Sequence, residues 1–360
     1  MDRDLIIKKY IDRDISFIVQ KYDYFLNGKC KLTLSGHTEW VTYIDILPSL
    51  DGGKIVSGSN DKSLKIWNSL TGQCELTLLG HTDWIMYIAI LSTSKGERIV
   101  SGSWDKSLKI WDPLTGKCEL TLLGHINSIT CVNILPDGRI ISASGGDSVK
   151  IWNPLTGNCE LTLLGHTDLI KDMDILSDGR IISISDDDFS TIWDPLQNDC
   201  KRELTLFGHT EYITCIFILR TLKGEKIITG SNDKSLKIWN GNKCELTLIG
   251  HTKWISCINA LSDQRIVSGS SDKSLKIWDG GECELTLIGH TNRISCLTIL
   301  PDDRIISGSA DESLKVWNTV NGHCEFTLQG HNDIITCIKI LPLSGHIVSA
   351  SRDGLLKIWH

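Results

Sequence analysis

The sequence predicts an all-β protein built from eight repeated units, each of four short antiparallel strands. Two marks recur with a long period: the dipeptide Gly-His, at spacings of 39 to 44 residues, and an apolar residue followed by Trp. Between the marks, runs such as CELTL, RIVSGS and SLKIW alternate apolar and polar residues, and Gly, Asp, Asn and Pro separate the runs. Alternation with a period of two over a few residues is typical of short strands.

Both marks occur once in each of the eight units. The Gly-His histidines are His37, His81, His125, His166, His209, His251, His290 and His331. The tryptophans that end the units are Trp67, Trp111, Trp152, Trp193, Trp239, Trp278, Trp317 and Trp359. Phrases such as SGSNDKSLKIWN recur almost unchanged before these tryptophans, which indicates that the units are close duplicates of one another.

These motifs resemble those of the WD40 family, in which Gly-His and Trp-Asp or Trp-Asn mark each repeat. The resemblance covers residues 30 to 360, over nine tenths of the chain. It implies a β-propeller, in which four-stranded blades surround a central channel and no long sheet edge stays open. Eight units imply eight blades, so we expect an eight-bladed WD40 propeller over residues 29–360.

The two ends of the repeated region offer strands that complete one another. Residues 357–360 correspond to the third strand of a last blade that then lacks its fourth strand. The phrase CKLTLSGH at the start of the region matches the CELTLLGH that precedes other Gly-His pairs. We therefore expect a strand at about residues 30–34 to pair with the last blade and close the ring.

Each unit also carries a Ser or Thr ten residues before its Trp and, in seven units, an Asp six residues before it. With the His, these types match a hydrolytic triad, but eight near-identical active sites are implausible, and no catalytic residue is predicted. The WD40 resemblance implies instead a buried tetrad, in which Asp accepts from His, His bridges to Ser, and Trp donates its indole N–H. The complete sets are His37, Ser57, Asp61 and Trp67; His81, Ser101, Asp105 and Trp111; His166, Ser183, Asp187 and Trp193; His209, Thr229, Asp233 and Trp239; His251, Ser268, Asp272 and Trp278; His290, Ser307, Asp311 and Trp317; and His331, Ser349, Asp353 and Trp359.

Blade three departs from this pattern. Its phrase SASGGDSVKIW places Gly146 where the Asp is expected and moves the acid to Asp147. Whether its tetrad is intact stays open.

Composition and charge restrict the partners. The net charge is -7 and Lys and Arg are spread among the acids, so no basic stripe is present for nucleic acid. No run of eighteen apolar residues occurs and the N-terminus does not match a signal peptide, so we expect a soluble cytoplasmic protein without membrane contact.

The thirteen cysteines are expected to be reduced, and most recur in phase with the repeat as strand residues. Eight of the eleven histidines belong to Gly-His pairs, so no metal or other cofactor is predicted.

In proteins similar to this one, contacts on the top face of the propeller come from three positions per blade. These are the third and fifth residues after the Gly-His histidine and the residue before the tetrad Asp. Carried over, the candidate partner-binding residues are Trp40, Trp84, Met86, Trp104, Leu169, Lys171, Asp186, Tyr212, Trp254, Arg293, Ile334 and Arg352. All four tryptophans outside the strand pattern fall in this set, and aromatic residues with arginine are typical of binding hot spots. The alternative is that the rings only cover neighbouring loops.

Residues 1–28 precede the propeller. Their apolar residues at positions 7, 11, 15, 18, 22 and 25 follow a spacing of three and four, which favours one amphipathic helix. Its apolar side would pack on the propeller, on a second copy of the chain or on another protein. The alternative is a decayed repeat, because YFLNGKC resembles IWNGNKC.

We expect a non-enzymatic interaction scaffold or adaptor that binds a peptide or loop of another protein on the top face. The alternative is an enzyme, or a propeller that binds a small ligand or glycan in its central channel, because fold does not fix function. A glycan-binding propeller would need the same pocket in most blades, whereas the top-face positions here differ from blade to blade. This unevenness favours one asymmetric protein partner.

Overall fold

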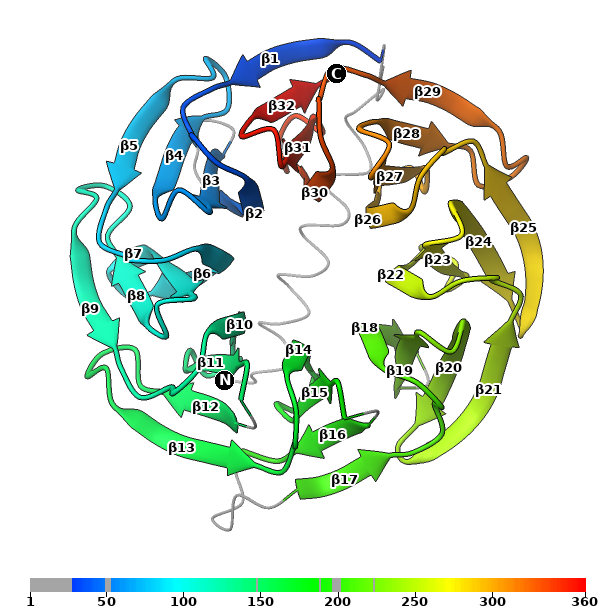
Figure 1. The fold of residues 1–360 in the computed structure, drawn as a ribbon, viewed down its shortest axis with the longest axis horizontal. Coiled ribbons are helices and arrows are strands. Elements are labelled where there is room, and N and C mark those ends of the chain that lie inside the picture. Colours follow the sequence, from blue (N-terminus) through cyan, green and yellow to red (C-terminus); the bar gives the residue numbers. More distant parts are fainter. Residues whose placement is uncertain (1–27, 49–52, 147, 188, 196–201, 223) are drawn as a thin grey trace.

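Eight antiparallel sheets of four strands each are arranged in a closed ring (Figure 1). The computed structural model describes residues 28–48, 53–146, 148–187, 189–195, 202–222 and 224–360. In seven sheets the strands are hydrogen-bonded in chain order, from an inner strand near the ring axis to an outer strand at the circumference, and in the eighth the outer strand is the first strand of the chain. The expectation of an all-β, eight-bladed propeller is confirmed.

The strands are short and their bounds repeat from blade to blade. In blades one to four they are β2 (Val41–Leu47), β3 (Lys54–Ser59), β4 (Leu64–Asn68) and β5 (Cys74–Leu78); β6 (Ile85–Thr93), β7 (Gly96–Ser103), β8 (Leu108–Trp111) and β9 (Cys118–Leu122); β10 (Ile129–Ile134), β11 (Ile140–Ser144), β12 (Ser148–Trp152) and β13 (Cys159–Leu164); and β14 (Ile170–Ile175), β15 (Ile181–Ser185), β16 (Ser190–Trp193) and β17 (Arg202–Leu206). In blades five to eight they are β18 (Ile213–Thr221), β19 (Gly224–Ser231), β20 (Ser235–Asn240) and β21 (Lys243–Ile249); β22 (Ile255–Ala260), β23 (Ile266–Ser270), β24 (Ser274–Asp279) and β25 (Glu282–Ile288); β26 (Ile294–Ile299), β27 (Ile305–Ser309), β28 (Leu314–Trp317) and β29 (Cys324–Leu328); and β30 (Ile335–Ile340), β31 (Ile347–Ser351), β32 (Leu356–Trp359) and β1 (Cys30–Leu34).

The core lies between the faces of neighbouring blades. Val100 and Leu108 of blade two, for example, share one buried cluster with Ile129, Ile140 and Trp152 of blade three. The second strand of each blade is covered on both faces, so all five residues of β11 are buried. The outer strand is covered on one face only, which is why β5 keeps the alternating pattern CELTL with Leu78 buried.

The ring is closed by the pairing of the first strand with the last. β1 runs antiparallel to β32 and completes the blade that β30 and β31 begin. Thr33 lies opposite Lys357, whose ammonium group donates to the Thr33 hydroxyl at 2.9 Å. Leu34 packs in the cluster that joins blade eight to blade one. The expected closure by residues 30–34 is confirmed.

Two further expectations concern a helix in residues 1–28 and helices that could span a membrane. The amphipathic helix expected in residues 1–28 lies outside the described residues, apart from Gly28. Within the described ranges, no helix is long and apolar enough to cross a membrane.

A hydrogen-bonded tetrad occupies the top of the blades, taking the top as the end of the ring that carries the Gly-His loops. In blade two, His81 Nδ1 lies 2.7 Å from Asp105 Oδ2 and His81 Nε2 lies 2.7 Å from Ser101 Oγ. The Trp111 indole N–H donates to the same Ser101 hydroxyl at 2.8 Å. The equivalent three bonds occur in every other blade except blade three, with Thr229 replacing Ser in blade five. These contacts tie the Gly-His loop to the second and third strands.

The glycine of most Gly-His pairs lies close to the tryptophan of its own unit. A Cβ on Gly80 would lie 3.3 Å from Cη2 of Trp111, and the φ of Gly80 is +155°. The backbone at Gly80 therefore passes close to the indole ring in a conformation that disfavours a residue with a side chain.

A further serine joins the tetrad, and sequence reasoning missed it. Ser107 donates through its hydroxyl to Asp105 Oδ1 at 2.6 Å, and its backbone N–H donates to the same oxygen. Burial raises the pKa of Asp105, but the hydrogen bonds from His81 and Ser107 outweigh it and hold that pKa well below its usual range. The signal was present in the sequence, because the phrase DKSLKIW repeats Ser two residues after the tetrad Asp.

Blade three keeps two of the three tetrad bonds. His125 Nε2 lies 2.7 Å from the Ser142 hydroxyl, which also accepts the Trp152 indole N–H. His125 Nδ1 is buried and has no hydrogen-bond partner in the described part of the chain. Because Gly146 offers no carboxylate, burial lowers the pKa of His125 to about 3. The call on Asp147 lies outside the described residues.

Removing one central hydroxyl should destabilise the fold. Ser101→Ala leaves the Trp111 N–H and the His81 imidazole buried without their shared partner, so we expect the free energy of unfolding to fall by about 2–4 kcal/mol. Urea denaturation followed by tryptophan fluorescence measures the change. The control is Thr121→Ala, which removes only an exposed hydroxyl bonded to Lys109 and should cost less than about 0.5 kcal/mol. Equal stability of the two variants would contradict the role given to Ser101.

The incomplete tetrad of blade three should lower stability at mildly acid pH, against an opposite contribution from Asp172, whose pKa is raised by burial to about 7. The folded His125 has a lowered pKa, so between about pH 6.5 and pH 3 the unfolded chain binds a proton that the folded chain does not. We expect this one group to cost up to about 1.4 kcal/mol per pH unit as the pH falls through that window. The seven tetrad Asp carboxylates have lowered pKa values, so their contribution is lost only at lower pH, below about 4.

Gly146→Asp tests the same idea by supplying the missing acceptor. Its Cβ would meet the Asn127 amide at 2.8 Å, the mobile end of an exposed side chain that is able to turn away. We expect the variant to gain about 1 kcal/mol near pH 7 and to lose the part of the pH dependence between 6.5 and 4 that His125 contributes. Urea denaturation at several pH values measures both effects. An unchanged slope in the variant would show that His125 is not the source.

Candidate functional site at the mouth of the ring

One backbone hydrogen bond places two of the three top-face positions side by side in every blade. In blade two, the backbone N–H of Trp104 donates to the carbonyl of Trp84 at 2.8 Å. The equivalent bond joins Asn60 to Trp40 in blade one and Arg352 to Ile334 in blade eight. The turn between the second and third strands is thereby fastened to the Gly-His loop, so their side chains emerge together.

A β-bulge positions the remaining top-face residue. In β6 the pairing with β7 shifts between Ile85 and Tyr87, so Met86 has no partner residue. The inner strand of every blade has the same irregularity, five residues after its Gly-His histidine. Bulges locally bend a strand and re-aim the side chain of the extra residue. Here the extra residue stands at the mouth of the ring.

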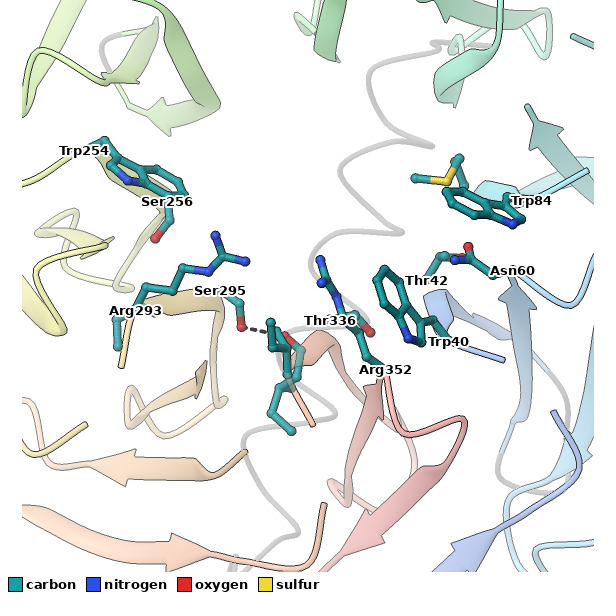
Figure 2. A pocket seen from close by; sticks show the side chains of 14 residues that line it. Trp40, Thr42, Asn60, Trp84, Trp254, Ser256, Arg293, Ser295, Thr336 and Arg352 are labelled. Carbon is teal, nitrogen blue, oxygen red and sulfur yellow. Dashed lines mark hydrogen bonds between the residues drawn. The ribbon is translucent and has the colours of Figure 1, made fainter. Parts of the chain in front are cut away.

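A hollow of about 370 Å³ opens at this mouth (Figure 2). It is lined by residues of blades one, two, six, seven and eight. The residues predicted to bind a partner that line it are Trp40, Trp84, Met86, Trp254, Arg293, Ile334 and Arg352, and they stand with Thr42, Asn60, Ser256, Ser295, Thr336 and two isoleucines. The closure of the ring therefore brings Trp40 and Arg352, which are far apart in sequence, to one site.

Two arginines of this hollow lie against tryptophan rings. The Arg352 guanidinium carbon is 4.2 Å from the ring centroid of Trp40, and that of Arg293 is 5.9 Å from the ring centroid of Trp254. A guanidinium over an aromatic face is held by the quadrupole of the ring. Each pair spans two blades, and 39% of the surface of Trp40 remains exposed.

A second hollow, of about 490 Å³, lies beside the first over blades two to four. Met86 lines both hollows, and Trp104, Leu169 and Lys171 line the second. The rings of Trp84 and Trp104 contact each other with centroids 4.4 Å apart, tilted by 33°. The two rings thus pack on each other, and 39% of Trp104 remains exposed.

Lys171, which lines the second hollow, also contacts the predicted residues Asp186 and Tyr212. Lys171 pairs with Asp186 and lies with its ammonium group 5.3 Å from the ring centroid of Tyr212. The opposite charges that sequence analysis placed on blade four thus neutralise each other. These contacts hold the side chains in place. Together, Lys171 and Asp186 carry no net charge.

No group of three or more His, Cys, Asp or Glu side chains in the described ranges is arranged to hold a metal ion. The described cysteines are free thiols. Burial raises the pKa of the Cys257 thiol to about 12, which keeps this inner-strand cysteine protonated.

Comparison with known proteins agrees with this architecture. The family model described as WD domain, G-beta repeat matches residues 28–68, 72–112, 116–153, 200–240, 242–279, 281–318 and 322–360. Residues 154–199 are unmatched, yet β14, β15 and β16 in this stretch pair in the same order as their counterparts. No curated protein is significantly similar to the chain.

A solved structure with the same arrangement is the crystal structure of the computationally designed Ika8 protein. It is 25% identical in sequence, and the match covers 92% of this chain and 99% of that chain with a TM-score of 0.80. Seven matched repeats within one ring of equivalent blades establish that the chain belongs to the WD40 family.

Proposed function

We propose that the protein is an interaction scaffold that binds a peptide or loop of a partner protein on its top face. The site is centred on Trp40, Trp84, Met86 and Trp104, with Arg352 beside them. The observation that carries this proposal is the gathering of Trp40, Trp84 and Trp254, none of them part of the strand pattern, around one hollow. Exposed aromatic and arginine side chains around a concavity are typical of binding hot spots.

The uneven lining of the hollow favours a protein partner over a repeated small ligand. Blades one, two and six supply tryptophans, whereas blades seven and eight supply arginines. A ligand that used equivalent subsites would need equivalent residues in most blades, and these blades differ at the same positions. An asymmetric peptide or loop matches such a surface.

The enzyme alternative receives less support from the geometry. The tetrads that resemble hydrolytic triads are buried and near-identical, and each Ser or Thr hydroxyl already accepts a Trp indole N–H. A nucleophile in that position has no room for a substrate. We therefore assign the tetrads to stability and the top face to binding.

A cytoplasmic location accompanies this proposal. Free thiols recur on the exposed outer strands, at Cys30, Cys74 and Cys159 among others. Such thiols persist in reducing compartments. Association between copies through residues 1–28 is part of the same proposal, resting on their amphipathic sequence pattern alone.

The triple variant Trp40→Ala, Trp84→Ala, Trp104→Ala tests the binding face. Each truncation at a hot spot typically costs about 2 kcal/mol of binding, so we expect the three together to abolish retention of the partner. Affinity purification with mass spectrometry compares the partners of wild type and variant, after circular dichroism has shown that both fold.

The matched control removes exposed apolar side chains at the other end of the blades. Leu114→Ala, Leu155→Ala, Val320→Ala changes residues that are at least 80% exposed in turns between third and fourth strands. This variant should keep every partner. Partners that survive the tryptophan variant but not the control would place binding on the opposite face, and a wild-type protein that retains no partner would favour the enzyme or small-ligand alternative.

A further inference from the structure

We propose that the segment bound at the top face carries an anionic side chain, a carboxylate or a phosphate ester, which lies between Arg293 and Arg352. This inference rests on the proposed function, because it names the chemistry that the same hollow selects. Three features of the hollow support it: its charge, the way its arginines are held, and an unsatisfied acceptor in its wall.

The hollow is positively charged on a protein that is negative overall. Its lining includes Arg293 and Arg352 and no Asp or Glu, whereas the whole chain has a net charge of -7. Neither guanidinium forms an ion pair with a carboxylate in the described ranges. The other arginines with described side chains all do, namely Arg98, Arg139, Arg180, Arg220, Arg265 and Arg304. These two cations are therefore the ones left for an external anion.

Stacking on Trp40 preorganises Arg352 for this use, and Arg293 lies over the Trp254 ring at a longer distance. A ring over the face of a guanidinium leaves the N–H groups at its edge free, and these are the groups that bind carboxylate and phosphate in pairs. Both guanidinium groups point into the hollow, Arg293 from blade seven and Arg352 from blade eight (Figure 2). Because stacking already restricts the Arg352 side chain, less conformational entropy is lost when an anion binds.

Asn60 requires that the bound segment also supply a hydrogen-bond donor. Its side-chain oxygen is buried without a hydrogen-bond partner, only 7% of the residue is exposed, and it lines the same hollow. It stands beside Trp40 and Trp84 (Figure 2). A buried acceptor without a partner is satisfied by an incoming N–H group, and the backbone amide of a peptide is such a donor. A peptide with an anionic side chain meets both demands, whereas a free inorganic anion meets only the first.

Three synthetic peptide pools test the inference on the full-length protein. Each pool has random neighbours around one fixed central residue, which is glutamate, phosphoserine or serine. We expect the glutamate pool, the phosphoserine pool or both to bind at least tenfold more tightly than the serine pool in fluorescence anisotropy. Preference for one of the two anionic pools identifies the source of the charge. The preference should weaken as the salt concentration rises.

Variants separate the charge from the shape of the site. Arg293→Gln and Arg352→Gln should each reduce binding of the anionic pools about tenfold and leave the serine pool unchanged, while the Lys variants should restore part of the loss. Asn60→Leu should weaken all three pools alike, because it removes an acceptor for the peptide backbone. Arg220→Gln, which changes an arginine paired with Glu225, is the control and should change nothing.

The outcomes distinguish this inference from the proposed function. Equal binding of all pools, no binding of either anionic pool, or arginine variants that keep the anionic preference would each overturn the inference. If partners are at the same time lost from the triple tryptophan variant, the top face remains the binding site and only its anion selectivity is wrong. If the triple variant keeps its partners, the proposed function itself fails.

Discussion

The Ser101 hydroxyl accepts the indole N–H of Trp111 and bonds to the His81 imidazole in a place that water does not reach. Each of the three groups belongs to a different segment of the blade, namely the second strand, the third strand and the Gly-His loop. An arrangement that separates them leaves buried polar groups without partners, which is costly in a low-dielectric interior. The rest of the blade depends on this one shared acceptor.

That dependence explains why the surface can vary while the scaffold repeats. The loop held by His81 continues directly into Trp84, and the turn held by Asp105 directly follows Trp104. The tetrad His and Asp, which are nearly the same in every blade, hold the backbone of both segments in place. Their side chains point outward and contribute little to the tetrad, so tryptophan, arginine or serine is accommodated there without loss of the fold.

The fold was predictable because it is periodic. Gly-His, Ser, Asp and Trp recur at fixed spacing, and the CKLTL phrase revealed where the fourth strand of the last blade comes from. The top-face positions were carried over from the WD40 resemblance, one blade at a time. The mutual contacts of these residues did not follow from the repeat, because the stacking of Arg352 on Trp40 joins two blades at opposite ends of the sequence. Likewise, the pairing of Lys171 with Asp186 and the unsatisfied oxygen of Asn60 depend on side-chain orientation, which a spacing of residues does not encode.

The pairing of β1 with β32 also sets an order of events during synthesis. Thr33 and Lys357, which meet in this pair, are 324 residues apart. At translation rates of roughly 5–20 residues per second, β1 leaves the ribosome about 15–65 s before its partner exists. Throughout that time it is a strand without a neighbour, and contacts of such long range form slowly. The nascent chain must therefore hold a nearly complete but open ring until β32 emerges and pairs with β1.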